Sequence, residues 1–249
     1  MEKRIRIGAV SYLNTRPLLY GIRHSKVAGN IELTEAYPSR IAAMLVNDEI
    51  DAGLVPVAII PELKESHIIS DYCIGADGDV ASVCIFSEVP LEETETLLLD
   101  YQSRTSVNLA RVLLREYWKK DIRFENARED FREHIKGTTA GVVIGDRALE
   151  QRNISPYVYD LSAAWKQHTG LPFVFAAWVA NKQLDNDFIV SFNAANAHGL
   201  AHVDEVVKEE AYPVYDLKHY YTENIDYNLD EAKKAGLALF LEKLKNNPR

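Results

Sequence analysis

The chain has 249 residues, of which 47% are hydrophobic and 26% are charged, and its formal net charge at pH 7 is −9. This length and composition are typical of a globular protein with one large core or two smaller ones, and we expect two lobes. The acidic balance, with Lys and Arg dispersed among Asp and Glu, excludes a nucleic-acid surface, which needs clustered cations to neutralise phosphates.

Neither a membrane segment nor a targeting segment is expected. No run approaches the roughly 20 apolar residues of a membrane helix. The start, Met-Glu-Lys-Arg followed by a short apolar run, lacks the apolar stretch of a signal peptide. We therefore expect a cytoplasmic protein with no membrane partner.

The first predicted strand, Ile5 to Val10, runs into the octapeptide Ser-Tyr-Leu-Asn-Thr-Arg-Pro-Leu at residues 11–18. Pro17 suits the first turn of a helix that continues to Arg23, and Asn14 or Thr15 can cap that turn. The unpaired N–H groups and the positive end of the helix dipole attract an anionic group. The same residues are also what an ordinary capped turn needs.

Ser39 is expected to cap an amphipathic helix over residues 41–47, and a short strand follows over residues 51–57. Gly53 either lets a ligand approach the backbone or relieves packing. This strand, helix, helix, strand opening is similar to that of the bilobal solute-binding fold.

A second strand-to-helix corner is predicted further along the chain. Strands are expected over residues 82–86 and 97–100, and a helix over residues 107–117. Ser103, Thr105 and Ser106 lie at the N-terminus of that helix. Because Ser103 or Thr105 must cap it, only the spare hydroxyls are candidates for binding.

The C-terminal half continues the alternation of strands and helices that is typical of an α/β fold. A strand over residues 141–145 ends before Asp146, whose carboxylate either caps the next helix, which we favour, or faces a cleft. A strand over residues 157–160 precedes a helix that ends near Thr169 and Gly170. Residues 173–180 form a near-continuous apolar run typical of a central strand, and helices are expected over residues 188–208 and 229–244.

No motif for a cofactor or a metal stands out. The chain has no Gly-rich loop of the P-loop or Rossmann type, so a nucleotide cofactor is not expected. Cys73 and Cys84 do not have metal-ligand spacing, and we expect both to be small buried residues. His198 and His202 are four residues apart without the Glu of a zinc-protease motif, which favours a solvated helix face over a metal site.

Five segments together resemble one known family. They are the octapeptide at 11–18, Gly-Asp-Val-Ala-Ser-Val at 78–83, Ser-Arg-Thr-Ser at 103–106, Val-Ile-Gly-Asp at 143–146, and Thr-Gly-Leu-Pro-Phe-Val-Phe at 169–175, flanked by Trp165 and Trp178. In this order they resemble the menaquinone-biosynthesis family of the futalosine route, and specifically its chorismate dehydratase branch. The sister branch, which forms a dihydroxynaphthoate, carries a Ser-Pro-Cys-Pro-Asn-Asp-Thr motif that this chain lacks.

The resemblance implies a fold, an activity and a partner. The implied fold is α/β, bilobal and periplasmic-binding-protein-like (type II), with one lobe from residues 1–88 and 180–249 and the other from residues 89–179. The implied activity is dehydration of chorismate to 3-[(1-carboxyvinyl)oxy]benzoate by a lyase that needs no metal or other cofactor. The partner is then the small-molecule substrate, while the oligomeric state stays open.

The resemblance and the corner positions together give the candidate site. Asn14 is the catalytic candidate, because its amide can hydrogen-bond a ring hydroxyl or a carboxylate without carrying charge. Arg16 either pairs with a substrate carboxylate or points to solvent. The other candidates for substrate binding are Ser11, Tyr12, Ser82, Ser103, Thr105, Ser106, Gly145, Asp146 and Thr169. Since these motifs contain no His or Glu, we hypothesise that a carboxylate of the substrate accepts the proton.

Two alternatives remain open from the sequence. One is a binding protein or sensor for a small carboxylate, which is the usual role of the bilobal fold but normally needs export. The other is the dihydroxynaphthoate-forming sister enzyme.

Overall fold

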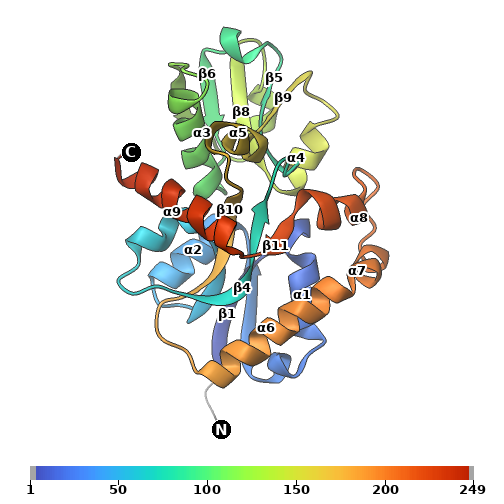
Figure 1. The fold of residues 1–249 in the computed structure, drawn as a ribbon. Coiled ribbons are helices and arrows are strands. Elements are labelled where there is room, and N and C mark those ends of the chain that lie inside the picture. Colours follow the sequence, from blue (N-terminus) through green and yellow to red (C-terminus); the bar gives the residue numbers. More distant parts are fainter. Residues whose placement is uncertain (1–3, 247–249) are drawn as a thin grey trace.

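The computed structural model describes residues 4–246, which form two lobes, drawn one above the other in Figure 1. Within these residues there are two mixed β-sheets, one of six strands and one of five. Residues 4 and 246, the two ends of the described range, belong to the lobe that contains the larger sheet. The two-lobed α/β architecture predicted from the sequence is confirmed.

The larger sheet has the strand order β11-β4-β10-β3-β1-β2. Its strands are β1 (Ile5–Val10), β2 (Ile31–Ala36), β3 (Ala52–Pro56), β4 (His67–Ala76), β10 (Phe173–Ala180) and β11 (Asp226–Asn228). β1 pairs in parallel with β2 and β3, and β10 runs antiparallel between β3 and β4. Every residue of β10 is buried, which confirms the central strand predicted from its apolar run.

The smaller sheet has the order β7-β6-β8-β5-β9. Its strands are β5 (Val83–Ser87), β6 (Thr96–Leu99), β7 (Arg123–Asn126), β8 (Thr139–Ile144) and β9 (Tyr157–Asp160). β6 pairs in parallel with β7 and β8, whereas β5 runs antiparallel to β8 and β9.

Helices cover both sheets (Figure 1). Those of the first lobe are α1 (Arg16–Arg23), α2 (Pro38–Val46), α6 (Asn186–Ala201), α7 (Val203–Glu209), α8 (Leu217–His219) and α9 (Glu231–Asn246). Those of the second lobe are α3 (Thr105–Glu116), α4 (Asp146–Gln151) and α5 (Leu161–Thr169). α1 packs closely on α6, and Gly199 allows this close packing because it has no Cβ. A Cβ at that position would lie 1.8 Å from the carbonyl oxygen of Pro17.

Two helix predictions are corrected. The helix expected over residues 188–208 is divided at His202 into α6 and α7. Ser39 is not a cap, because α2 already begins at Pro38 after the extended Tyr37, and proline is favoured in that first turn. The helix expected over residues 229–244 is present as α9.

The chain crosses between the sheets twice. The first crossing, residues 77–82, lies between β4 and β5, and the second, residues 170–172, lies between α5 and β10. The boundaries expected at 88/89 and 179/180 each fall one strand after these crossings, because β5 pairs in the second sheet and β10 in the first. We propose the crossings as the lobe boundaries.

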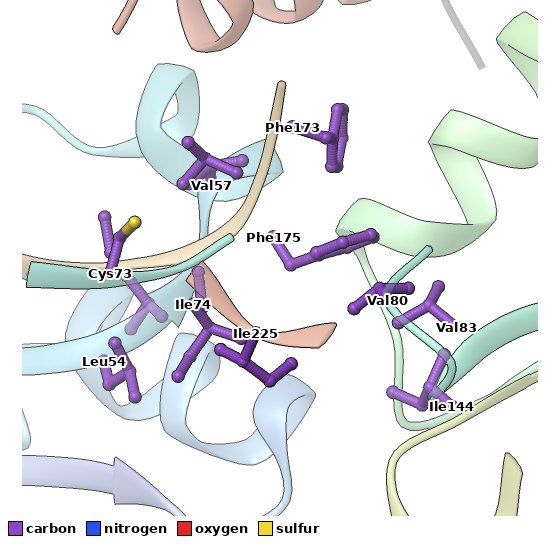
Figure 2. Close-up of a cluster of buried hydrophobic side chains, with 14 of the residues drawn as sticks. Leu54, Val57, Cys73, Ile74, Val80, Val83, Ile144, Phe173, Phe175 and Ile225 are labelled. Atoms are coloured by element: carbon purple, nitrogen blue, oxygen red, sulfur yellow. The ribbon is translucent and has the colours of Figure 1, made fainter. Parts of the chain in front are cut away.

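Buried apolar side chains join the lobes at these crossings. Figure 2 shows Phe175 of β10 pointing toward Val80, Val83 and Ile144 of the second lobe, while Ile74 lies on the side of the first. All five belong to one buried cluster that continues through both lobes. The hinge is therefore a packed core rather than a bare linker.

Candidate active site

A small cavity lies where the carboxyl ends of β1, β3 and β8 meet between the lobes, and it has a volume of about 50 Å³. Its polar wall consists of Tyr12, Asn14, Thr15, Ser103, Thr105, Ser106 and the backbone of Gly145. Its apolar wall consists of Val10, Pro38, Pro56, Ile74, Val83, Ile144, Phe175 and Ala176. Crevices at the carboxyl ends of strands are where open α/β sheets bind ligands.

Asn14 enters the cavity from a single 3₁₀ turn, Leu13–Thr15, between β1 and α1. Its carbonyl oxygen accepts a hydrogen bond from the Tyr227 hydroxyl at 2.9 Å, which fixes the turn against β11. Its side-chain Oδ1 accepts from the Thr15 hydroxyl at 3.1 Å. Among residues 4–246 nothing accepts from the Asn14 amide nitrogen, so two N–H donors remain for a ligand.

The second corner, between β6 and α3, contributes three hydroxyls with different roles. The Ser103 hydroxyl accepts from the Ser106 N–H at 3.1 Å and so stabilises the start of α3. The Thr105 hydroxyl accepts from the Ala58 N–H of the first lobe at 3.2 Å. The Ser106 hydroxyl has no hydrogen-bond partner within the described part of the chain and lines the cavity. Ser106 is therefore the spare hydroxyl of this corner.

Tyr12 closes the cavity toward the second lobe. Its ring lies against Gly145, where a Cβ would be 2.7 Å from a ring carbon, and Gly145 has a φ of +65°, which favours glycine. Its hydroxyl donates to Oε1 of Gln102, which also accepts from the Arg147 guanidinium at 3.0 Å. Burial raises the pKa of Tyr12 well above its ordinary value, so its phenol stays neutral.

Among the described residues, none of the side chains that line the cavity carries a charge at neutral pH. The nearby cation Arg147 is held by Asp100, with contacts of 2.8 and 2.9 Å. The Thr15 and Arg16 N–H groups donate to the carbonyls of Tyr12 and Leu13, and the Ser106 N–H donates to Ser103. An anionic ligand in the cavity would therefore meet the Asn14 amide and the Ser106 hydroxyl near the positive ends of the α1 and α3 dipoles. The arrangement suits a carboxylate that is held by neutral donors.

The family model described as "Menaquinone biosynthesis" matches residues 5–246. The chain belongs to this family. It is 28% identical to a chorismate dehydratase of Thermus thermophilus over 263 residues, covering 96% of this chain and 94% of the relative. It is 27% identical to a chorismate dehydratase of Campylobacter jejuni over 246 residues, covering 96% of both.

Solved structures show the fold of this menaquinone-biosynthesis family member. A protein of Archaeoglobus fulgidus matches with a TM-score of 0.74 at 14% identity, over 98% of this chain and 97% of that one. A Candida albicans protein with the generic periplasmic binding protein structural fold matches with a TM-score of 0.65 at 14% identity, over 99% and 92% of the two chains. The periplasmic-binding-protein-like fold predicted from the sequence is thus confirmed.

Asp146 does not cap its helix, so the favoured interpretation of this residue is wrong. It is the first residue of α4, and its carboxylate reaches across the lobes to accept from the Leu13 N–H at 3.0 Å. Burial raises its pKa to about 6, which the contact with Leu13 partly opposes. In this family member Asp146 therefore holds the turn that carries Asn14, and it is not among the residues that line the cavity.

The structure does not bring four other candidates to the cavity wall. Ser11 is exposed. Arg16 is paired with Glu210, with 3.0 Å between its Nε and Oε1 of the carboxylate. The buried Ser82 hydroxyl accepts from Tyr220 at 2.6 Å, and the Thr169 hydroxyl donates to the carbonyl of Trp165 one turn earlier in its own helix, at 2.8 Å.

The apolar wall and the pair Gln102 and Arg147 were not predicted from the sequence. Both of these residues flank motifs that were identified, since Gln102 precedes Ser103 and Arg147 follows Asp146. No signal in the sequence shows that they meet Tyr12, because that contact forms only when the lobes come together.

The described residues offer neither a metal-binding cluster nor a membrane-spanning helix. No group of three or more His, Cys, Asp or Glu residues in that range is placed to hold a metal ion. The rings of His198 and His202 contact one another, with centroids 4.1 Å apart and planes tilted by 45°. Cys73 and Cys84 are buried free thiols, as predicted. No helix between residues 4 and 246 has the length and apolar character needed to cross a membrane.

Proposed function

We propose that this protein is a chorismate dehydratase, a lyase that converts chorismate to 3-[(1-carboxyvinyl)oxy]benzoate in the cytoplasm. The observation that carries the proposal is the uncharged cavity, in which the free Asn14 amide and the free Ser106 hydroxyl come from opposite lobes. Support also comes from the relatives, which are chorismate dehydratases that match 96% of the chain.

The reaction is a β-elimination. The C–H bond at the ring carbon that bears the enolpyruvyl ether breaks, and its electron pair forms a double bond to the neighbouring carbon. That carbon loses its hydroxyl, which leaves with the proton as water. The ring becomes aromatic, so the protein has to supply orientation and hydrogen bonds rather than an oxidant or a reductant.

We assign Asn14 to the leaving hydroxyl, because its amide nitrogen is a donor without a partner in residues 4–246 and develops no charge. The Ser106 hydroxyl, at the positive end of the α3 dipole, holds a carboxylate of the substrate. The cavity wall contains no carboxylate or imidazole, and the pKa of Tyr12 is raised, so none of these side chains suits the role of base. The proposal therefore gives that role to a carboxylate of the substrate.

The test is to incubate the purified protein with chorismate and no added cofactor, and to follow products by liquid chromatography with mass detection. We expect a species lighter by one water that retains the enolpyruvyl group, and it should be absent from a protein-free sample. Asn14→Ala and Asn14→Asp should both lose turnover, whereas Asn47→Ala, an exposed asparagine outside the cavity, should keep it. Near-normal turnover in both Asn14 variants would remove Asn14 from the mechanism.

A binding protein or sensor for a small carboxylate is the second candidate function. The absence of a side-chain base from the cavity wall favours it. It predicts that chorismate stays intact while small carboxylates raise the thermal unfolding temperature of the protein. Appearance of the dehydrated product would reject this alternative.

A further inference from the structure

A second and larger depression adjoins the cavity on the outside of the lobe junction. This groove has a volume of about 620 Å³ and shares Ser103 with the cavity wall. Its first-lobe side is the start of α2, and its second-lobe side is formed by the ends of β6 and β7 and by α3. The exposed Tyr37 of the first lobe faces Tyr101 of the second, with ring centroids 6.4 Å apart. The groove therefore bridges the two lobes.

The groove is cationic, although the chain as a whole has a net charge of −9. Arg40, Arg104 and Arg111 line it, and its one acidic residue, Asp100, is bound by Arg147 at 2.8 Å. Arg40 contacts the exposed Glu49 at 3.3 Å. The guanidinium of Arg104 has neither an ion pair nor a hydrogen bond to any residue between 4 and 246.

A narrow clasp separates the groove from the cavity. The Ser39 N–H donates to the carbonyl of Gln102 at 3.1 Å, and the Ser39 hydroxyl donates to the carbonyl of Tyr101 at 3.2 Å. The Tyr12 hydroxyl donates to the Gln102 side chain. All three contacts join the first lobe to residues 101–102, so opening the lobes here breaks them and connects the two spaces.

The sizes of the two spaces show why such a connection is needed. A cavity of about 50 Å³ holds only a few water molecules, at roughly 10–15 Å³ each. A ring with two carboxylate-bearing substituents has to enter while the lobes are apart. The groove has the volume that small-molecule sites usually have, about 300–1,000 Å³.

We propose that the groove is the entry site for the substrate, where Arg104 and Arg111 capture an aromatic or cyclic dicarboxylate before the clasp opens. This inference rests on the proposed function, because it assigns the same dianionic substrate to a first, external site. The cationic groove raises the association rate of the dianion, and the neutral cavity then carries out the chemistry. Arg104 is a positioning residue in this scheme and does not contact the reacting atoms.

The experiment compares Arg104→Gln, at the residue that precedes α3, with Arg115→Gln, which removes the same charge in the last turn of α3 and outside the groove. For a dianion about 8 Å from one guanidinium in water, Coulomb attraction corresponds to about a fivefold effect. We therefore expect kcat/KM of Arg104→Gln to fall about fivefold with kcat unchanged, and Arg104→Lys to restore it. The decrease of kcat/KM with added salt should be shallower in Arg104→Gln than in the wild type, because salt screens this attraction. Arg115→Gln should match the wild type.

A second measurement separates this inference from the proposed function. Isophthalate, a simple aromatic dicarboxylate, is mixed with each protein in a stopped-flow instrument, and association is followed by tryptophan fluorescence. If chorismate stays intact but isophthalate associates more slowly with Arg104→Gln than with the wild type, the dehydratase proposal fails and the entry site stands. If chorismate is dehydrated and Arg104→Gln retains the kcat/KM and salt dependence of the wild type, the entry site is overturned. Isophthalate association that is absent or equal in all variants also overturns it.

Discussion

The buried position of Asp146, whose carboxylate contacts Leu13, predicts how the free energy of unfolding depends on pH. Burial raises the pKa of Asp146 from its ordinary 3.8 to about 6, so the folded protein holds this proton more tightly than the unfolded chain does. The free energy of unfolding therefore falls as pH rises from about 4 to about 6 and stays lower above that range. At about 1.4 kcal/mol per pKa unit, the ionised carboxylate destabilises the fold by about 3 kcal/mol at pH 8.

Asp146→Asn removes this penalty while keeping an oxygen that accepts from the Leu13 N–H. We expect the variant to be more stable than the wild type by up to about 3 kcal/mol at pH 8, with the advantage shrinking toward zero near pH 4. Urea unfolding followed by tryptophan fluorescence at several pH values measures it. Asp121→Asn, which replaces an exposed carboxylate, serves as the control and should follow the wild type. A stability difference for Asp146→Asn that is constant across pH, or negative at pH 8, would refute the reasoning.

Three further changes test the cavity and its closure. Ser106→Ala removes the spare hydroxyl and should weaken isophthalate binding in isothermal titration by about 10- to 100-fold, since a hydrogen bond to a charged group is worth about 1.5–3 kcal/mol. Unchanged affinity would reject this contact. Gly145→Ala places a Cβ against Tyr12 at a residue with a positive φ. In urea unfolding, it should lower the free energy of unfolding by about 2 kcal/mol or more. Stability equal to that of the wild type would show that the backbone at Gly145 adapts without cost. Thr105→Val deprives the Ala58 N–H of its acceptor in the other lobe. We expect the lobes to open and small-angle X-ray scattering to show a larger radius of gyration. A scattering curve identical to that of the wild type would show that this hydrogen bond does not hold the lobes closed.

The sequence predicts the parts of this fold that depend on local patterns. The apolar run at residues 173–180 gives β10 with the expected bounds, because a strand covered on both faces needs apolar residues throughout. The polar residues before Pro17 mark the turn between β1 and α1, because proline is favoured in the first turn of a helix. The lobe boundaries are harder to predict from the sequence, because they depend on which sheet β5 joins. The buried, mostly apolar sequence of β5 is compatible with either sheet.

In the candidate site too, the sequence predicts the residues that depend on local pattern but not those that depend on distant partners. Asn14, Ser103, Thr105 and Ser106 reach the cavity because each lies at a strand-to-helix corner, which local sequence shows. Ser82 lies instead between strands β4 and β5, and its hydroxyl is taken by Tyr220, which is 138 residues away along the chain. Partners at that separation are decided by packing, so the sequence gives a set of candidate hydroxyls and the fold selects among them.

The neutrality of the cavity wall also bears on how the proton would leave the substrate. A guanidinium or ammonium beside the substrate carboxylate would lower the pKa of that carboxylate and make it a weaker base. A neutral donor such as the Ser106 hydroxyl holds the carboxylate with a smaller effect on its pKa. Exclusion of water by the closed lobes acts in the opposite direction from a cation, because desolvation raises the pKa of a carboxylate. A dianionic substrate that acts as its own base therefore needs cations where it is captured and none where it reacts. The groove provides the cations, and the cavity wall is neutral.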